Sequence, residues 1–372
     1  MRYLPLLLII GLFSCNPETA EDPLQFALNS ESDLIRQVID SVDQYEVQIK
    51  LSVIRREKDS VLFEEYDYRL DDSVYFYPAS TVKFPVSILA LEQIQQDDRL
   101  DLDTPFFVEG DSLFTTMRDD IQDIFAVSSN ETFNRLFDYL GKDNINQKLK
   151  SKGIFPVRIS HRLSTSDAYE LTTRPLIIQQ ADSSLITTES IINKPIQDLT
   201  INETTKGKGY YSNDELIEEP MDFRQRNYLP ISTLHQTIKR VFFPEHFNSS
   251  GRFDLTREHR DFLIKSMALI PRELGYNTTD YYDSYGKFFI YGDNKDPIPD
   301  HVRIYNKVGY AYGYLTDCAY IQDNLNDIEF ILSATIHVNK DKIFNDDVYE
   351  YDEIGIPFLA QLGREIHSYL IR

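Results

Sequence analysis

A serine and a lysine three residues apart, Ser80 and Lys83, introduce the apolar segment 84–91. If a helix starts there, the two side chains share a face one turn apart. A serine hydroxyl becomes a strong nucleophile when a base removes its proton, and a lysine with a lowered pKa can be that base. The pair therefore predicts attack of Ser80 on a carbonyl carbon. The alternative is a capped core helix with a solvent-facing lysine, because Ser-x-x-Lys alone is a weak pattern.

Two more short polar sets follow along the chain, Ser128-Ser129-Asn130 and Lys307-Val308-Gly309. The first set precedes the amphipathic stretch 133–140, so that Ser or Asn at this place could simply cap a helix. The second set lies in the predicted strand 304–310. A lysine beside a glycine is common on a strand, and neither set is informative by itself.

Taken in order, the three sets resemble the Ser-x-x-Lys, Ser-x-Asn and Lys-Thr/Ser-Gly motifs of serine β-lactamases and penicillin-binding proteins. The segment 127–141 resembles that family over its whole length. The catalytic residues that the resemblance implies are Ser80, Lys83, Ser128 and Lys307, and the implied substrate-binding residues are Asn130, Gly309 and Tyr310.

The resemblance also implies a role for each residue. Ser128 and Lys307 would pass a proton to the leaving group, and Asn130 would hold the substrate with its amide. Gly309 would let the substrate backbone approach closely. The backbone N–H of Tyr310 would join that of Ser80 to form an oxyanion hole.

Two departures from the family pattern limit what can be expected. Val308 lacks the hydroxyl that would bind a substrate carboxylate, which is worth about 1.5–3 kcal/mol. The Glu-x-x-Leu-Asn element of class A β-lactamases, whose glutamate activates the deacylating water, is not found in the sequence. The corresponding region 160–170 offers Asp167 and Glu170 at an unsuitable spacing, and both are interpreted as surface charges. Rapid turnover of β-lactams is therefore not expected.

The leading hypothesis is a serine hydrolase, similar to class A β-lactamases, that acts on an amide or ester through a Ser80 acyl-enzyme. Its substrate would be a small molecule or peptide, such as a β-lactam or a cell-wall peptide. The alternative is a binding protein of the cell envelope that keeps this fold but has lost turnover. A third possibility is chance similarity on an unrelated α/β fold. No metal or organic cofactor is expected, because the seven histidines are scattered without metal-binding spacing.

The amino-acid composition limits the kinds of molecule that the protein is expected to bind. The formal net charge of −22 argues against binding to nucleic acid, and the 42% hydrophobic content is typical of a globular protein. A monomer is expected. Cys318 lies in a predicted strand and is interpreted as a small buried residue, not a nucleophile.

The N-terminus resembles that of a bacterial lipoprotein. Arg2 precedes an apolar run of ten residues, 4–13, which is too short to span a membrane as a helix. The run ends in Leu-Phe-Ser-Cys, similar to a lipobox. Residues 1–14 are therefore predicted to be a signal peptide and Cys15 to carry lipid, anchoring the protein in the bacterial cell envelope. The alternative is an ordinary secretory signal.

Periodicity predicts the domain organisation. Residues 15–30 are interpreted as a tether. A helix capped by Ser32 follows, and then come the alternating strands 47–53 and 61–68. Helical periodicity dominates from about 80 to 280, with stripes at 133–140 and 234–241, and a polar, irregular insertion covers about 183–226. Strands return at 302–307 and 328–336, and a helix starts near Pro357.

This order predicts an α/β (α+β) domain over 31–372. A sheet lobe would come from both chain ends, about 31–78 and 285–372, with a helical lobe of about 79–284 inserted between them. The order also resembles the β-lactamase fold.

Overall fold

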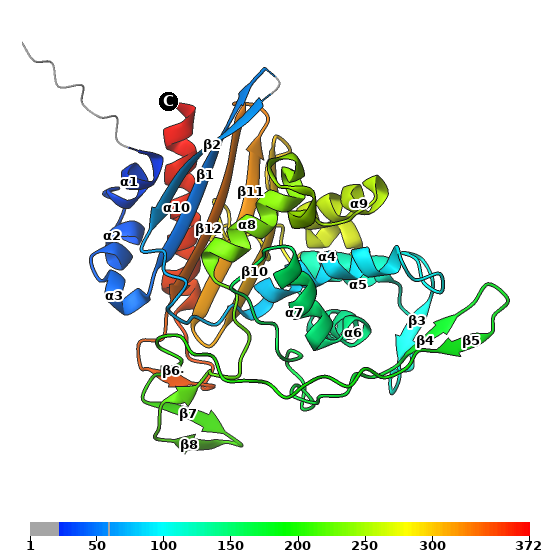
Figure 1. Cartoon of the computed structure of the whole chain (residues 1–372). Helices are drawn as coiled ribbons and strands as arrows, with labels where there is room; N and C mark the ends of the chain where they lie inside the picture. Colours follow the sequence, from blue (N-terminus) through cyan, green and yellow to red (C-terminus); the bar gives the residue numbers. More distant parts are fainter. Residues whose placement is uncertain (1–21, 59) are drawn as a thin grey trace, which may run out of the picture.

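One antiparallel sheet with helices on both faces forms the centre of the computed structural model, which describes residues 22–58 and 60–372 (Figure 1). Its α-helices are α1 (Pro23–Leu28), α2 (Asp33–Ile39), α3 (Val42–Tyr45), α4 (Lys83–Ile94), α5 (Met117–Ala126), α6 (Asn130–Leu140), α7 (Lys142–Ser151), α8 (Ile231–Phe242), α9 (Arg257–Ala268) and α10 (Ile356–Ile371). Short 3₁₀ turns cover Ala79–Val82, Pro244–His246, Ser249–Gly251 and Pro271–Leu274, and a π-helical turn covers Tyr351–Gly355.

The strands fall into one large and three small sheets. They are β1 (Gln48–Glu57), β2 (Ser60–Tyr68), β3 (Phe106–Val108), β4 (Leu176–Gln179), β5 (Leu185–Thr187), β6 (Thr205–Lys206), β7 (Gly209–Ser212), β8 (Glu215–Ile217), β9 (Met221–Asp222), β10 (Val302–Ala311), β11 (Tyr314–Asp323), β12 (Ile328–His337) and β13 (Ile343–Phe344). The large sheet has the order β10-β11-β12-β1-β2, so that β12 pairs with β1 across almost the whole sequence. Both chain ends therefore build the sheet, as predicted.

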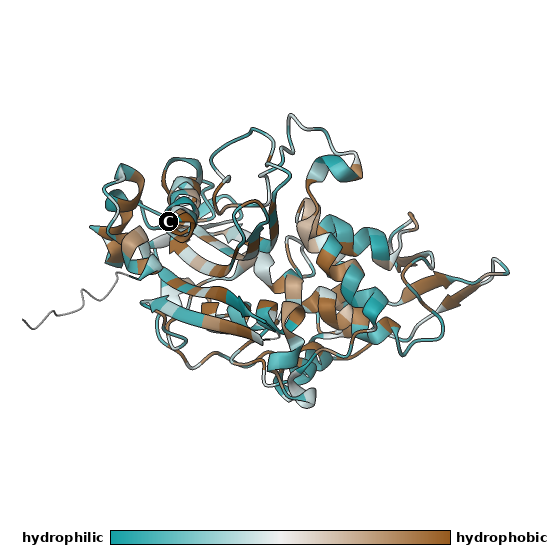
Figure 2. Ribbon diagram, turned by 90° about the horizontal axis from the view of Figure 1, so that it is seen from above, coloured by the Kyte–Doolittle hydropathy of each residue, from teal (hydrophilic) through white to brown (hydrophobic). Residues whose placement is uncertain are grey.

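Burial along the strands follows their place in the sheet. β11 and β12 are buried on both faces; β12 is mostly apolar, whereas β11 also buries polar side chains such as Asp317. β2 is an edge strand, and its half-exposed residues alternate with exposed ones. Figure 2 shows hydrophobic and hydrophilic residues alternating along several ribbons, as elements with one buried face require.

Different helices cover the two faces of the sheet. α1, α2 and α10 pack together on one face (Figure 1), and α8 crosses the other face over β1, β11 and β12. The helices α4–α6 and α9 extend from that second face as the predicted helical lobe. α4 is buried along nearly its whole length, because its sequence is apolar all round.

The prediction of a tether over residues 15–30 is wrong for 23–28, which form α1. Asp22 caps this helix by accepting the Gln25 N–H at 2.7 Å, and Pro23 occupies its first turn. Leu24, Ala27 and Leu28 are buried, and α1 contacts α10. Burial of these apolar residues offsets the conformational entropy that the segment loses when it becomes ordered. The signal peptide and Cys15 lie outside the described residues.

The insertion predicted over about 183–226 contains the short strands β5–β9 and reaches the sheet lobe. β7 pairs in parallel with β13, near the C-terminal end of the chain. Phe223 packs against Tyr75 and Phe344 at ring distances of 5.4 Å. The insertion is therefore bound to both ends of the chain, which places its last residues beside the cleft between the lobes.

None of the helices in the described ranges has both the length and the hydropathy needed to cross a membrane.

Candidate active site

Ser80 lies in the 3₁₀ turn Ala79–Val82, directly before α4, and Lys83 is the first residue of α4. The predicted helix start is confirmed, although the serine belongs to the tighter turn that precedes it. Ser80 is partly exposed, whereas the Lys83 side chain is fully buried at 0% exposure. The buried α4 thus carries a reactive amine next to a hydroxyl at the surface of a cleft.

In the second motif, Ser128-Ser129-Asn130, one residue caps a helix and the other two are available for another role. Ser129 is the N-cap of α6 and accepts the Thr132 N–H at 3.4 Å. The capping interpretation therefore applies to Ser129 and leaves Ser128 and Asn130 free for another role. Ser128 adopts a left-handed backbone with φ of 57°. Such a conformation is costly for a residue other than glycine, and such strain clusters at functional sites.

The two lysines meet at the Ser128 hydroxyl. Lys83 Nζ donates to the Ser128 carbonyl oxygen at 2.5 Å, to Asn130 Oδ1 at 2.7 Å and to Ser128 Oγ at 3.3 Å. Lys307 Nζ donates to Ser128 Oγ at 2.8 Å and to the Val308 carbonyl oxygen at 2.9 Å. Residues up to 224 positions apart thus converge on one hydroxyl.

Burial changes the ionisation of both amines. It lowers the pKa of Lys83 well below its usual value, and the neighbouring Lys307 lowers it further. It also lowers the pKa of Lys307 to about 7, although the carboxylate of Asp317 opposes this shift. A neutral Lys83 can donate two N–H bonds, to the Ser128 carbonyl and Asn130, and keep a lone pair for a hydroxyl proton. Lys83 is thus suited to be a base and Lys307 to be a proton donor near neutral pH.

The Ser80 hydroxyl makes no hydrogen bond within the part of the chain that the structure describes. Lys83 instead bonds to Ser128 and Asn130, so the direct contact between nucleophile and base is not formed here. Catalytic hydrogen bonds of unliganded enzymes often shorten only when substrate is bound. The placement of Ser80 and Lys83 matches the prediction, whereas direct proton transfer between them remains a hypothesis.

Gly309 brings β10 close to the turn that carries Ser80. A Cβ atom at this position would lie 2.6 Å from the Pro78 carbonyl oxygen and 2.8 Å from the Ser80 backbone nitrogen. The glycine therefore lets the strand approach this turn, and its role toward substrate stays a prediction. Tyr310 follows it and is 47% exposed. The oxyanion hole predicted from the N–H groups of Ser80 and Tyr310 stays a prediction.

Val308 faces the apolar core and not the cleft. It is 3% exposed and packs in the cluster that contains Phe289 and Leu315. In the register it lies opposite Asp317, while Lys307 lies opposite Cys318 on the other face of the sheet. The second residue of this motif therefore contributes no polar group to the substrate.

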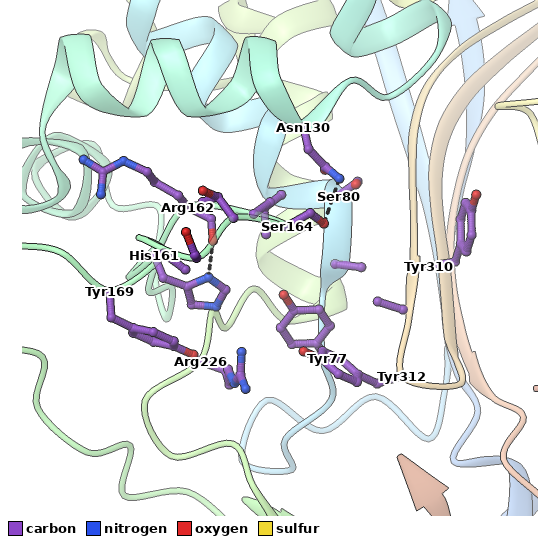
Figure 3. A pocket seen from close by; sticks show the side chains of 16 residues that line it. Tyr77, Ser80, Asn130, His161, Arg162, Ser164, Tyr169, Arg226, Tyr310 and Tyr312 are labelled. Atoms are coloured by element: carbon purple, nitrogen blue, oxygen red, sulfur yellow. Dashed lines mark hydrogen bonds between the residues drawn. The ribbon is translucent and has the colours of Figure 1, made fainter. Parts of the chain in front are cut away.

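A pocket of about 340 Å³ opens at Ser80 (Figure 3). Its lining residues are Tyr77, Ala79, Ser80, Asn130, His161, Arg162, Leu163, Ser164, Thr165, Ser166, Ala168, Tyr169, Arg226, Tyr310, Ala311 and Tyr312. The volume lies within the range of small-molecule sites. The lining mixes hydroxyl, aromatic and basic side chains, and three residues predicted to be catalytic, Lys83, Ser128 and Lys307, lie outside it.

One face of α6 holds the wall of this pocket. Asn130 donates to Ser164 Oγ at 2.9 Å, and Asn134 exchanges two hydrogen bonds with the backbone of Leu163 at 2.8 and 2.9 Å. Asp138 forms a fully buried ion pair with Arg162. These α6 residues recur every four positions, so they share one helix face. Sequence analysis missed this polar stripe, which the spacing 130, 134 and 138 could have indicated.

The wall that α6 holds contains no carboxylate at the pocket. Asp167 accepts a hydrogen bond from Thr165 Oγ1, which lowers the pKa of the carboxyl, and neither Asp167 nor Glu170 lines the pocket. His161 is buried, and burial lowers its pKa to about 4. Its Nδ1 donates to the Arg162 carbonyl oxygen at 2.6 Å, which leaves Nε2 to accept the N–H of residue 227. The neutral imidazole thus holds the backbone of the pocket wall through these two hydrogen bonds.

A second group of buried charges lies on the opposite face of β10 and β11 from Lys307. Asp317 accepts hydrogen bonds from Asn306 Nδ2 at 2.8 Å and from the Phe288 N–H at 3.0 Å, and burial raises its pKa to about 6. Lys287 donates to Asn306 Oδ1 at 2.8 Å, and burial lowers its pKa to about 8. An aspartate inside an apolar strand was the sequence signal for this group, and sequence analysis overlooked it.

Cys318 is 1% exposed, and burial raises the pKa of its thiol. It is a buried residue of β11, as predicted, and not a nucleophile. Within residues 22–58 and 60–372, no three side chains of His, Cys, Asp or Glu come together in a way that could hold a metal ion.

Comparisons with known proteins concern the family and the fold of the chain. Residues 33–191 match a family described as "Beta-lactamase enzyme family". The crystal structure of a β-lactamase from Sphaerobacter thermophilus DSM 20745 is similar with a TM-score of 0.52 and 12% identity, over 94% of this chain and 96% of that one. A structure of L2 complexed with relebactam has a TM-score of 0.48 and 14% identity, over 94% and 99% of the two chains. No curated protein matches the sequence significantly. The first likeness confirms the predicted fold class.

Proposed function

We propose that the chain is a serine hydrolase of the class A type, because residues 33–191 match the β-lactamase family model and the fold is similar to that of a β-lactamase. One observation carries the proposal. The Ser128 hydroxyl lies within hydrogen-bond distance of the buried amines of Lys83 and Lys307, at 3.3 and 2.8 Å, beside a pocket that Ser80 and Asn130 line.

In the proposed reaction, Ser80 Oγ forms a bond to the carbonyl carbon of an amide or ester, and Lys83 takes the hydroxyl proton. The tetrahedral oxyanion is held by backbone N–H groups of Ser80 and Tyr310. When the bond to the leaving group breaks, Ser128 gives that group its proton and is reprotonated from Lys307 or Lys83. Water then cleaves the Ser80 ester, releasing the acid and restoring the hydroxyl.

We expect the second half of this cycle to be slow. No Asp or Glu lines the pocket, so no carboxylate stands ready to activate the deacylating water. The groups nearest to that role are the hydroxyls of Ser164, Thr165 and Ser166, which are poor bases at neutral pH. A β-lactam or a cell-wall peptide would therefore acylate Ser80 and stay attached for longer than in an efficient β-lactamase.

Covalent labelling tests the proposal. The purified protein is incubated with a fluorescent penicillin and, separately, with a fluorophosphonate, which needs no β-lactam recognition. We expect a labelled band with at least one of the two probes, loss of that band in Ser80→Ala, and no loss in the control Ser250→Ala, an exposed serine elsewhere. A folded protein that neither probe labels would instead support an envelope binding protein without turnover.

Mass spectrometry of the intact protein measures the lifetime of the acyl-enzyme. After excess benzylpenicillin or ester is removed, we expect the added mass to persist for minutes or longer. Loss of the added mass within seconds would contradict the expectation of slow deacylation that follows from the missing carboxylate. It would not contradict the assignment of Ser80 as the nucleophile.

We also propose that the protein is a monomer attached to the bacterial cell envelope by lipid on Cys15. The support is the sequence pattern at residues 1–15 alone. Metabolic labelling with an alkyne fatty acid tests the anchor: incorporation in the native protein and none in Cys15→Ser is expected. Incorporation that survives the substitution would refute it.

A further inference from the structure

Arg226 is a cation in the pocket that the proposed chemistry does not use. It lies at the end of the insertion and lines the same pocket as Ser80. Across the described parts of the chain, its guanidinium makes no ion pair and no hydrogen bond. It lies over the rings of Tyr169 and Tyr312, with the guanidinium carbon 5.4 and 5.7 Å from their centroids. These contacts hold the group by its faces and leave its N–H donors unpaired.

The surrounding structure holds Arg226 in this place. Arg158 donates to the carbonyl oxygen of Arg226 from Nε at 3.1 Å and from Nη2 at 2.5 Å. The same side chain also binds the carbonyl oxygens of Gln197 and Arg224, at 2.7 and 2.8 Å. The N–H donors of Arg158 therefore fix the backbone segment that carries Arg226. A guanidinium presented this way is already ordered before a ligand arrives.

The charge distribution makes this position unusual. The chain carries a formal net charge of −22, yet no acidic side chain lines the pocket. Asp222, whose carboxylate interacts with the charge of Arg226, is already bound by Arg224 through hydrogen bonds of 2.7 to 3.1 Å. An unpaired guanidinium inside a small concave site attracts anions and suits the two oxygens of a carboxylate.

The position of the pocket decides which part of a substrate the guanidinium meets. In the proposed reaction the leaving group departs toward Ser128 and Lys307, which lie outside the pocket lining. Figure 3 shows Ser80 and Asn130 at one end of the pocket, and Arg226 with Tyr169 and Tyr77 toward the other. The pocket therefore receives the acyl portion of the substrate.

We propose that Arg226, with the rings of Tyr169 and Tyr312, is a subsite for a carboxylate carried on the acyl portion of the substrate. This inference rests on the proposed acylation of Ser80 for its orientation. It also gives the anionic part of a substrate a partner that Val308 cannot provide. The preferred substrates are accordingly esters or amides of dicarboxylic acids that keep one free carboxylate.

Matched esters test the charge preference. The p-nitrophenyl monoesters of succinic, glutaric and adipic acid each carry a free carboxylate, and their methyl esters are neutral partners of nearly equal shape. We expect kcat/KM to favour the anionic member by about ten- to hundredfold at the best length, the value of one or two hydrogen bonds to a charged group. Arg226→Gln should reduce this ratio to near one, and Arg226→Lys should keep part of it.

Arg257→Gln is the matched control, because Arg257 is exposed, lies in α9 and is outside the pocket lining. It should leave the ratio as in the native protein. A native protein that hydrolyses both members of every pair equally would overturn the subsite, as would an Arg226→Gln variant that keeps the preference.

A binding measurement separates failure of the subsite from failure of the proposed hydrolase. Calorimetric titration with glutarate and with monomethyl glutarate requires no turnover. If no probe labels Ser80 but glutarate binds more tightly than its monoester only when Arg226 is present, the subsite stands and the hydrolase fails. If Ser80 is labelled while binding is independent of Arg226, the subsite fails and the hydrolase stands.

Discussion

Replacement of Lys307 by Met provides a direct test of the electrostatics of the site. Burial lowers the pKa of Lys307 to about 7, whereas a lysine in an unfolded chain titrates near about 10.4. Between these values the unfolded chain holds more protons at this site than the folded chain, so that stability rises with pH. The side chain is 2% exposed, and little solvent screening reduces the effect.

The size of the effect follows from the difference between the two pKa values. At about 1.4 kcal/mol per unit of pKa difference, burial of this amine destabilises the folded protein by about 4 kcal/mol at pH 7 and by about 2 kcal/mol at pH 9. Lys307→Met removes the titrating group and keeps a side chain of similar length. The hydrogen bonds to Ser128 and Val308 are lost at both pH values and cancel from the comparison.

Urea unfolding at pH 7 and pH 9 measures the difference. We expect the stability of Lys307→Met relative to the native protein to fall by about 2 kcal/mol between pH 7 and pH 9. The same comparison in a Lys83→Met background removes the coupling between the two amines, and Lys340→Met, at an exposed position, serves as a control. A difference that stays constant with pH, or rises, would refute the low pKa and the assignment of Lys307 as a proton donor near neutral pH.

Two further substitutions test parts of the site. Asp138→Asn removes the negative charge from the buried ion pair with an arginine of the pocket wall, and urea unfolding should show that the free energy of unfolding falls by about 3–5 kcal/mol. Asp103→Asn, in an exposed ion pair, should lower it by less than about 1 kcal/mol. Equal losses in the two variants would contradict the importance of burial. Gly309→Ala places a Cβ 2.8 Å from the Ser80 nitrogen, and displacement of the nucleophile by about 1 Å should slow fluorophosphonate labelling about 10²-fold. Gly286→Ala, where the nearest atom would be 3.8 Å away, should label at the native rate, and a Gly309→Ala variant that does the same would disprove the close approach.

Much of the architecture could be predicted because the periodicity of the sequence is set by burial. The alternation over 47–53 and the stripe at 133–140 became β1 and α6, since each has one apolar face and a partner to cover it. α1 was missed because Pro23 next to acidic residues suggested a linker. The same proline, placed after Asp22, also begins a helix.

The candidate site was predictable only where motifs mark it. Ser80, Ser128 and Lys307 belong to ordered patterns, and the structure brings Ser128 and Lys307 into contact. Arg226 has no such pattern, since it follows an irregular polar segment and its position depends on long-range contacts with Arg158. The close packing of Gly309 against the Ser80 turn likewise depends on a pairing between distant segments that periodicity does not reveal.

The pairing of β12 with β1 has a consequence for how the protein is made. About 270 residues separate the end of β1 from the start of β12, and a ribosome adding about 5–20 residues per second needs roughly 15–55 s to bridge that gap. During this interval the β1–β2 hairpin lacks its partner strand β12, and two strands alone are marginally stable in water. The edge of β1 is therefore unpaired in the nascent chain for most of its synthesis. A chain that ends between β11 and β12 would contain all three motifs but would lack the strand that joins β10 and β11 to β1 and β2.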